Sequence, residues 1–460
     1  MLIYNFFKEI YLLDSIVLIY MKLKFKRCLD IEGEIKAPSS KSYTHRAIIL
    51  ASLADGYTQV FNPLLSEDTL STLNACITLG ADITNFGNYI DINGVDGIIK
   101  PNFNPQPFIT NPEHIINLGN SGTSLRLLTS IAALGDTEVV FTGDDSLQTR
   151  PMGDLLEALK PLGVKTESVG NKAPITVFPG FNGGITSISG NVSSQFISSI
   201  LISAPLTEKG VELEVLPEFV SKPYVDMTID IMNKFGVNVD VSFEGKNTKF
   251  IVKPQKYTAC DYIVEGDYSS SSYLLAACAI FGGKITILNL FKDSKQGDKI
   301  ILDILSEMGA DINCDVNSVT IKSQGNLKSI DEIDLSNAPD LLPTIAILAA
   351  LAEGTTKIVG IGHTRFKETD RIATTCEELR KCGCELEEFE DYIIIKGQTL
   401  SKNEEFIVSS HKDHRLAMAF ILLNLKGYSV VVDEGDVFNV SFPEFIEAMG
   451  SIGVNLELSY

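Results

Sequence analysis

The hexapeptide "KFGVNV" (residues 234–239) is one of six similar junctions along the chain. In each junction a stretch with helical periodicity ends in an apolar residue and a glycine, and an alternating pattern typical of a strand follows. The glycines recur at intervals of 70 to 83 residues, which indicates an internal repeat. The other junctions are "TLGADI" (78–83), "PLGVKT" (161–166), "EMGADI" (307–312), "KCGCEL" (381–386) and "SIGVNL" (451–456).

A second series of six segments interleaves with these junctions. Each segment has, within its first two residues, Ser, Asn or Asp, which cap helices, and then becomes almost wholly apolar, as in "NVSSQFISSILISAPL" (191–206). A helix that is apolar all round is expected at the centre of a domain. Each repeat is therefore predicted to hold a buried helix, an amphipathic helix and several short strands. The other segments are 39–56, 119–135, 267–283, 337–354 and 410–427.

Six such units in 460 residues are too many for one core, so we expect a mixed α and β protein with two domains of three repeats each. The stretch "KLKFKRCLDIEGEIKAP" (22–38) has the pattern of a strand that completes the sheet of the last repeat. One domain is therefore predicted to be discontinuous, with residues 21–38 plus 266–460. The other, residues 39–265, is inserted into it, and the cleft between them is the expected ligand site.

The first 20 residues are apolar, but three charged residues interrupt them, and no run reaches the ~20 apolar residues of a membrane span. We expect residues 1–20 to be an extension outside the fold and the protein not to bind membranes. The net charge of −21 also argues against nucleic-acid binding. Eight cysteines without zinc-ligand spacing favour free thiols in a reducing compartment, and hence a cytoplasmic location.

Cations recur near the starts of the predicted helices, where the helix dipole disfavours them. One such residue has little meaning, but repetition suggests that an anion binds where these ends meet. Helix N-termini, serine hydroxyls and the glycines of "GNSGTS" (119–124) would add donors to such a site. The cations are Lys41, Arg46, Arg126, Arg150, Lys222, Lys367, Arg371, Lys412 and Arg415.

Nucleotide, flavin and metal motifs are not found, so neither a cofactor nor a metal is predicted. "HKDHR" (411–415) is only a weak metal signal. "SSSS" (269–272) is most simply a capping loop, and "EELRK" (377–381) is interpreted as a solvated helix face. Asp340 in "APDLLPT" has two open interpretations, as a helix cap or as an acid–base group.

Ten segments, in this order, resemble the 5-enolpyruvylshikimate-3-phosphate synthase (3-phosphoshikimate 1-carboxyvinyltransferase) family, from residue 21 to the C-terminus. The segments are "APSSKSYTHRA" (37–47), "LGNSGTSLR" (118–126), "RPMG" (150–153), "SSQF" (193–196), "SKPYVDMT" (221–228), "VEGDYSSSSY" (264–273), "APDLLPTIA" (338–346), "KETDR" (367–371), "KDHRLAM" (412–418) and "FPEF" (442–445).

The resemblance implies the enolpyruvyl transferase fold, a two-domain inside-out α/β barrel with three βαβαββ repeats per domain, six in all. It also implies a reaction of the shikimate pathway, which leads to chorismate and the aromatic amino acids. The enolpyruvyl group of phosphoenolpyruvate moves to the 5-hydroxyl of shikimate 3-phosphate through a tetrahedral intermediate, and phosphate leaves. Both substrates carry a phosphate and a carboxylate, as the cationic helix starts require. We expect a monomer.

The resemblance also assigns site residues. It implies that Asp340, Glu368 and Lys41 are catalytic. The residues implied to bind shikimate 3-phosphate are Lys41, Ser42, Arg46, Ser193, Ser194, Gln195, Ser221, Tyr224, Asp340 and Lys367. Those implied to bind phosphoenolpyruvate are Lys41, Asn120, Gly122, Arg150, Gln195, Arg371 and Arg415.

Two positions depart from the family pattern. Val440 stands where many relatives have a lysine that contacts phosphoenolpyruvate, and His363 stands where some have Asn. Neither change removes an acid–base group, so retained activity with altered donor affinity is expected. The nearest rival is UDP-N-acetylglucosamine enolpyruvyltransferase, but its reactive cysteine is missing from the loop "TGDDSLQTRPMG" (142–153). A six-repeat scaffold without catalysis would not explain why acids and cations occur together.

Overall fold

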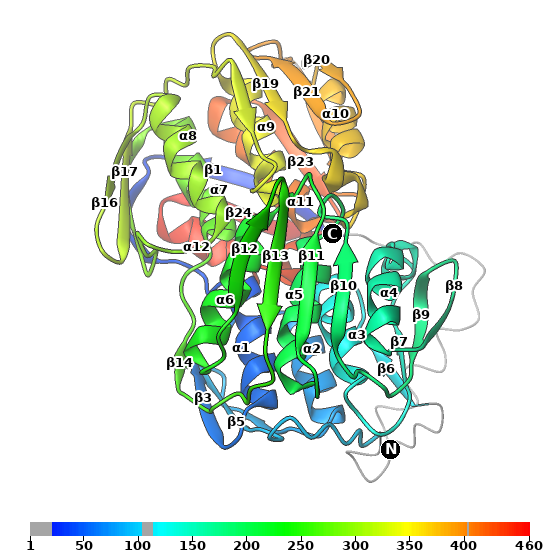
Figure 1. Ribbon diagram of the computed structural model, residues 1–460. Coiled ribbons are helices and arrows are strands. Elements are labelled where there is room, and N and C mark those ends of the chain that lie inside the picture. The colour runs from blue at the N-terminus through cyan, green and yellow to red at the C-terminus, as the bar shows by residue number, and fades with distance from the viewer. Residues whose placement is uncertain (1–20, 104–113, 403) are drawn as a thin grey trace, which may run out of the picture.

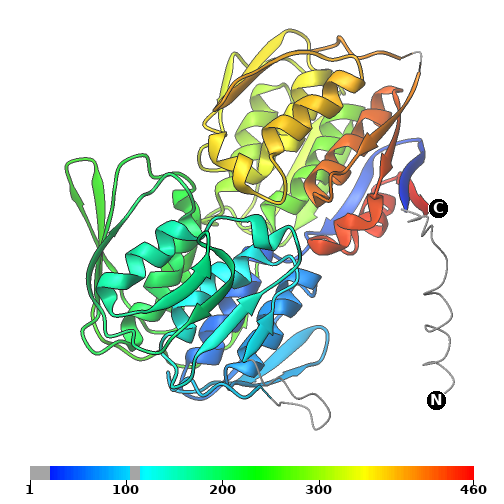
Figure 2. The same cartoon turned by 90° about the vertical axis from the view of Figure 1, so that its right-hand side faces the viewer.

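The computed structural model describes residues 21–103, 114–402 and 404–460, which form two lobes joined side by side (Figures 1 and 2). Each lobe has its own hydrophobic core. The core of the lower lobe in Figure 1 is drawn from the stretch between Tyr43 and Val264. The core of the upper lobe takes Leu23, Ile31 and Ala37 and then the stretch from Tyr268 to Leu456. The prediction for residues 1–20 lies outside the described residues.

The described strands form six four-stranded sheets with one common pairing pattern. In every sheet the first two strands are parallel, and the other neighbours are antiparallel. In the lower lobe, the strands of the first sheet are ordered β14 (Tyr262–Ile263), β3 (Tyr57–Phe61), β5 (Tyr89–Asn93) and β4 (Asp82–Asn85). Those of the second are β6 (Ile115–Asn117), β7 (Val139–Thr142), β9 (Lys172–Val177) and β8 (Thr166–Val169). Those of the third are β10 (Gly184–Ile188), β11 (Val211–Val215), β13 (Asn247–Val252) and β12 (Asp240–Glu244). In the upper lobe, the strands of the first sheet are ordered β2 (Glu32–Lys36), β15 (Gly283–Leu288), β17 (Ser318–Ser323) and β16 (Asp311–Cys314). Those of the second are β18 (Glu332–Asp334), β19 (Thr355–Val359), β21 (Tyr392–Lys396) and β20 (Glu385–Glu388). Those of the third are β22 (Glu405–Ser409), β23 (Ser429–Asp433), β1 (Lys22–Cys28) and β24 (Val454–Ser459).

Six helices are buried almost completely, as their apolar sequences predict. Some polar side chains bond from one of these helices to another, as Ser130 does with Ser199 and Ser272 with Thr344. The buried helices are α1 (Lys41–Leu53), α3 (Gly122–Ala132), α5 (Ser194–Ser203), α7 (Tyr268–Phe281), α9 (Leu342–Leu351) and α11 (His414–Phe420). The remaining α-helices are α2 (Glu67–Thr78), α4 (Gly153–Leu159), α6 (Lys222–Lys234), α8 (Ile301–Glu307), α10 (Arg371–Lys381) and α12 (Phe445–Ser451).

The six junction glycines behave as their sequence context predicts. All have positive φ, between 84° and 115°, a region that L side chains rarely adopt. Gly236, for example, follows α6 and turns the chain toward β12. The prediction of helix–glycine–strand junctions is therefore confirmed. The six glycines are Gly80, Gly163, Gly236, Gly309, Gly383 and Gly453.

The chain crosses between the lobes along two paired segments. Ser39 forms an antiparallel bridge with Gly266, and the Ser40 amide donates to the Glu265 carbonyl at 2.8 Å. The strand predicted near the chain start is present, since β1 pairs with β23 and β24 of the last sheet. The same stretch also holds β2, which joins a different sheet beside β15. The two lobes are therefore joined by a pair of hydrogen-bonded segments.

Within the described ranges, no helix has both the length and the apolar character needed to cross a membrane.

Candidate active site

A cavity lies between the lobes, and helix starts from both sides open into it. Most of the sequence-predicted residues line this cavity, although they are spread over more than 370 positions of the chain. The lining residues are Lys41, Ser42, Asp68, Gly122, Thr123, Arg126, Arg150, Pro151, Val192, Ser193, Ser194, Gln195, Ser221, Tyr224, Asp340, His363, Phe366, Lys367, Glu368, Arg371 and Arg415.

Among the described residues, six cationic side chains and three carboxylates line the cavity. The cavity is therefore locally basic, although the whole chain carries a formal charge of −21. Such a concentration of cations at helix starts matches the predicted small-anion site.

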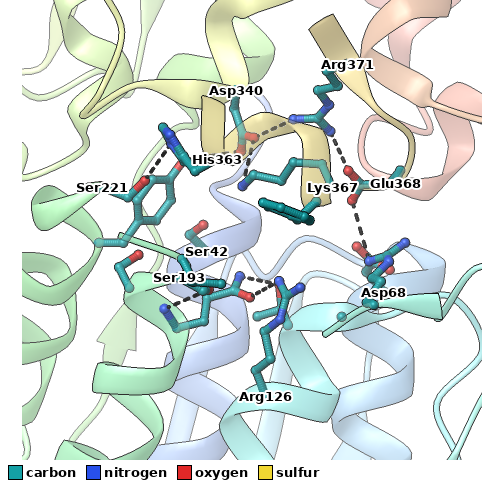
Figure 3. A pocket seen from close by; sticks show the side chains of 18 of the residues that line it. Ser42, Asp68, Arg126, Ser193, Ser221, Asp340, His363, Lys367, Glu368 and Arg371 are labelled. Atoms are coloured by element: carbon teal, nitrogen blue, oxygen red, sulfur yellow. Dashed lines mark hydrogen bonds and ion pairs between the residues drawn. The ribbon is translucent and has the colours of Figure 1, made fainter. Parts of the chain in front are cut away.

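Arg371 organises the upper wall (Figure 3). Its Nη1 lies 2.7 Å from Asp340 Oδ1, its Nη2 lies 2.6 Å from Glu368 Oε2, and its Nε lies 2.7 Å from Asp413 Oδ2. The side chain is only 1% exposed, so these ion pairs are shielded from water. One buried guanidinium thus fixes the two carboxylates that the family resemblance marks as catalytic.

Asp340 is surrounded by positive charge. Besides Arg371, it pairs with Arg415 Nη2 at 2.8 Å and with Lys367 Nζ at 3.5 Å. Burial alone would raise the pKa of Asp340, but these cations outweigh burial and hold its pKa well below the usual range. Burial is likewise outweighed at Glu368, where Arg371 and Arg150 keep the pKa well below the usual range. Both groups are therefore ionised.

Asp340 does not cap α9, which settles one of its two interpretations. It lies in a short 3₁₀ turn (Pro339–Leu341), and within the described residues its carboxylate accepts hydrogen bonds from side chains only. Asp370 is the cap of α10, since its Oδ1 accepts from the Ala373 amide at 3.0 Å. The carboxylate of Asp340 points into the cavity instead (Figure 3).

Besides Lys41, Asp68, Arg126 and Arg150, the lower wall carries hydroxyl and amide groups at helix starts. Ser193 caps α5, and its Oγ accepts from the Gln195 amide at 3.3 Å. Ser194 is the first residue of the same helix. Gln195 bridges to α3, because its Oε1 accepts from Arg126 Nη1 at 2.8 Å and its Nε2 donates to Thr123 at 3.0 Å. Ser193 and Arg126 lie below Asp340 and Arg371 of the upper wall (Figure 3).

Ser221 closes one end of the cavity. It has a left-handed backbone conformation (φ 54°), and its amide donates to the Ser336 carbonyl of the upper lobe at 2.8 Å. Its hydroxyl lies 3.3 Å from His363 Nε2. Burial, followed by the charge of Lys367, lowers the pKa of His363 to about 4, so its ring is neutral at physiological pH. A neutral ring here accepts or donates hydrogen bonds without adding charge.

Gly122 opens α3 beneath Arg150. A Cβ atom at residue 122 would lie 2.6 Å from Arg150 Nη1, so a larger residue would displace that guanidinium. Arg150 also contacts Asn120 and lies 3.9 Å from Glu368 Oε1 on the opposite wall. The glycine therefore sets the position of a cation that spans the two walls.

Two predicted site residues do not line the cavity. Arg46 is 1% exposed and lies behind the lower wall, where it donates to Thr228 and to the carbonyls of Ser42 and Tyr224. Asn120 lies behind Arg150. Neither side chain faces the cavity, and both form hydrogen bonds with residues that line it.

Several lining residues were absent from the predicted set. Asp68 pairs with Lys41 Nζ at 2.8 Å. The sequence shows no sign that Asp68 lines the cavity, because acidic residues are common in the first turn of a helix. Arg126 had a signal, since it is one of the cations near helix starts. The others are Thr123, Pro151, Val192, His363 and Phe366. Val440 ends a 3₁₀ segment (Gly435–Val440) outside the lining set.

The interpretation of "EELRK" as a solvated face is wrong for Glu378. This side chain is fully buried. Its Oε1 lies 2.7 Å from Lys381 Nζ and 2.6 Å from His411 Nε2. Glu377, Glu378 and His411 form the group in the described residues that could hold a metal ion. The Lys381 ammonium already pairs with both glutamates, which disfavours a cation at this position.

Comparison with known proteins agrees with this geometry. The model of the EPSP synthase (3-phosphoshikimate 1-carboxyvinyltransferase) family matches residues 26–449. The chain therefore belongs to the EPSP synthase family, and it is an enzyme of that class.

Individual relatives extend this result. The chain is 59% identical over 452 residues to the 3-phosphoshikimate 1-carboxyvinyltransferase of Methanobrevibacter smithii, with 95% of this chain and all of that protein covered. It is 50% identical to the protein of the same name from Methanothermobacter thermautotrophicus, with 95% and 100% covered. A solved EPSP synthase from Acinetobacter baumannii matches with a TM-score of 0.77 at 28% identity, covering 96% of this chain and 100% of that one.

Proposed function

We propose that this protein transfers the enolpyruvyl group of phosphoenolpyruvate to the 5-hydroxyl of shikimate 3-phosphate, with release of phosphate. The observation that carries the proposal is the convergence of Asp340 and Glu368 with six cations in one cavity between the lobes. Two substrates that each carry a phosphate and a carboxylate need such a set of cations. The names of the relatives, which cover nearly the whole chain, support this acceptor and donor.

In the addition step, Asp340 removes the proton of the 5-hydroxyl as the oxygen attacks C2 of phosphoenolpyruvate. The double-bond electrons take a proton at C3 from Glu368, with Lys41 close to both substrates. Glu368 first takes this proton from solvent, because its carboxylate is otherwise ionised. In the elimination step, a C3 proton returns to Glu368, the double bond re-forms, and the C2–O bond to phosphate breaks. The proton from the 5-hydroxyl ends on the released phosphate. General acid–base groups of this kind contribute about 10²–10⁴-fold each.

The binding roles follow the two walls. We assign the shikimate phosphate to Ser193, Ser194 and Lys367, because a helix start and an ammonium face the same space. Ser42, Gln195, Ser221 and Tyr224 would hold the rest of the acceptor, with Arg46 acting from behind. We assign phosphoenolpyruvate to Gly122, Arg150, Arg371 and Arg415, with Lys41 and Gln195 between the substrates and Asn120 orienting Arg150.

We also propose the finer architecture. Two separate cores and a paired crossing at Ser39 and Gly266 support a discontinuous domain, residues 21–38 plus 266–460, with residues 39–265 inserted as the second. Six sheets with a common pairing pattern support three βαβαββ units per domain, arranged as inside-out barrels around the buried helices. We expect a cytoplasmic monomer that needs no cofactor or metal, and the eight free cysteines support a reducing compartment.

One assay tests the function. The purified protein is incubated with phosphoenolpyruvate and either shikimate 3-phosphate or UDP-N-acetylglucosamine, and phosphate release is measured. Release with shikimate 3-phosphate alone is the expected result. Release only with UDP-N-acetylglucosamine would assign the other enolpyruvyl transfer, and release with neither would reject the proposal.

A further inference from the structure

A second buried carboxylate lies directly behind Asp340. Asp298 belongs to a 3₁₀ turn (Gly297–Ile300), is 4% exposed and does not line the cavity. The Tyr224 hydroxyl lies between the two acids, 3.2 Å from Asp298 Oδ2 and 3.2 Å from Asp340 Oδ2. The other oxygen of Asp298, Oδ1, has no hydrogen-bond partner among the residues that the structure describes. A chain of three oxygens therefore leads away from the cavity.

The backbone fixes this arrangement. A Cβ atom at Gly297 would lie 2.2 Å from the Asn337 carbonyl oxygen and 3.1 Å from Pro223 Cγ, so only glycine permits the close approach. Pro223 immediately precedes Tyr224 at the start of α6, and Asn337 lies just before Asp340. The turn that carries Asp298 is thus packed against both segments that carry the other two members of the chain.

One hydroxyl cannot satisfy two ionised acids. The Tyr224 hydroxyl has a single hydrogen, so it donates to Asp298 or to Asp340 but not to both. The three groups are mutually hydrogen-bonded only when one additional proton resides on one of the acids. The site is therefore built to hold that proton and to exchange it between the two ends.

The two ends differ strongly in their affinity for a proton. Arg415, Lys367 and Arg371 stabilise the anion of Asp340. Burial, followed by the charges of Asp340 and of Asp267, the cap of α7, raises the pKa of Asp298 to about 7, although Arg415 and the Tyr224 hydroxyl act in the opposite direction. A proton is more stable on Asp298 than on Asp340. The strongly ionised Asp340 is a weak base by itself, and a better acceptor lies two hydrogen bonds away.

We propose that Asp298 receives, through the Tyr224 hydroxyl, the proton that Asp340 removes from the acceptor hydroxyl. This inference rests on the proposed function. As the Asp340 O–H bond breaks, the Tyr224 oxygen takes that proton, and the tyrosine passes its own hydrogen to Asp298 Oδ2. Asp340 becomes a carboxylate again, Tyr224 keeps one hydrogen, and Asp298 becomes neutral. The proton returns along the same path to the departing phosphate, so protons balance over the turnover.

Asp298 does not touch the substrate. It acts through Tyr224, by holding the proton that Asp340 has removed. It must be ionised before the reaction, and turnover therefore rises with pH as Asp298 loses its proton near pH 7. Phosphate groups of the substrates titrate in the same range. Only a difference between the pH profiles of matched variants isolates Asp298.

The test compares Asp298→Asn, Tyr224→Phe and the double variant, with Asp303→Asn of helix α8 as the control. kcat and both KM values are measured from pH 5.5 to 9, and melting temperatures report folding. We expect Asp298→Asn to lower kcat about tenfold, to leave both KM values within about twofold and to lose the wild-type rise near pH 7. We expect Tyr224→Phe to lose the same rise and the double variant to lose no more kcat than the slower single variant.

An Asp298→Asn enzyme that keeps both its kcat and the rise near pH 7 would overturn the relay. A double variant whose loss is the product of the two single losses would also overturn it. If Asp298→Asn fails to fold, Tyr224→Phe decides, because a retained rise in that variant contradicts the relay. A wild-type protein that releases no phosphate contradicts the proposed function instead, so the two failures are distinguishable.

Discussion

The two walls of the cavity are built from different chemistry. The upper wall holds ion pairs between buried groups, in which Arg371 alone contacts three carboxylates. The lower wall holds serine hydroxyls, the Gln195 amide and the starts of α3 and α5, together with Arg126, Arg150 and the Lys41–Asp68 ion pair. In the described part of the chain, only the upper wall joins two carboxylates to one buried guanidinium, and this pairing fixes their ionised state. The lower wall adds neutral hydroxyl and amide donors to its cations, and neutral donors bind an anion without changing their protonation. The difference suggests that proton transfer is centred on Asp340 and Glu368 of the upper wall, whereas the cations of both walls and the neutral donors of the lower wall bind the substrates.

The largest expected effect is the loss of turnover when an acid–base group of the upper wall is replaced. Glu368→Gln keeps the shape of the side chain but removes the acid–base group, so kcat should fall by about 10³-fold while the KM values change little. Steady-state kinetics measure this, and Glu377→Gln, an exposed position on the neighbouring helix α10, is the control. Weakened substrate binding with retained kcat would return Glu368 to a structural role.

The next effect concerns the stability that the paired charges provide. Arg371→Met leaves Asp340, Glu368 and Asp413 without their shared partner, which should lower the free energy of unfolding by about 3 kcal/mol. Denaturant unfolding measures it. Arg380→Met is the matched control on the same helix, because its pair with Glu388 is half exposed and should contribute less than about 1 kcal/mol. Equal losses in the two variants would contradict the distinction between the buried network and the surface.

A smaller effect is expected on the lower wall. Ser194→Ala removes one neutral donor, which should raise the KM for shikimate 3-phosphate about tenfold and leave kcat within about threefold. Ser189→Ala, in the preceding loop and outside the cavity, is the control. A loss confined to kcat would mean that the lower wall takes part in the chemistry and that the two walls do not divide the work.

The smallest effect concerns Val440, where the family resemblance leads us to expect a lysine. Val440→Lys adds a cation, and we expect the KM for phosphoenolpyruvate to fall about threefold because one more charge attracts the donor. Val241→Lys on the exposed strand β12 controls for the change in net charge. An unchanged KM would show that Val440 has no influence on donor binding, as its place outside the cavity lining permits.

The sequence predicts what depends on local rules. The junction glycines and buried helices were predictable because a positive φ and an all-round apolar helix leave a direct signature, as at Gly236 and α5. Motifs identified most of the cavity. The position of Arg46 behind the lining could not be predicted, because a motif match does not show on which side of its neighbours a guanidinium lies. Glu378 and Asp298 escaped because their burial depends on contacts with distant segments, His411 and Tyr224.

The most direct test of the division between the walls is a crystal structure of the complex with shikimate 3-phosphate. We predict that the phosphate oxygens lie about 3 Å from the Ser193 and Ser194 hydroxyls and from Lys367, and that the 5-hydroxyl forms a hydrogen bond with Asp340. A phosphate bound beside Arg150 and Gly122, with the 5-hydroxyl away from Asp340, would contradict it.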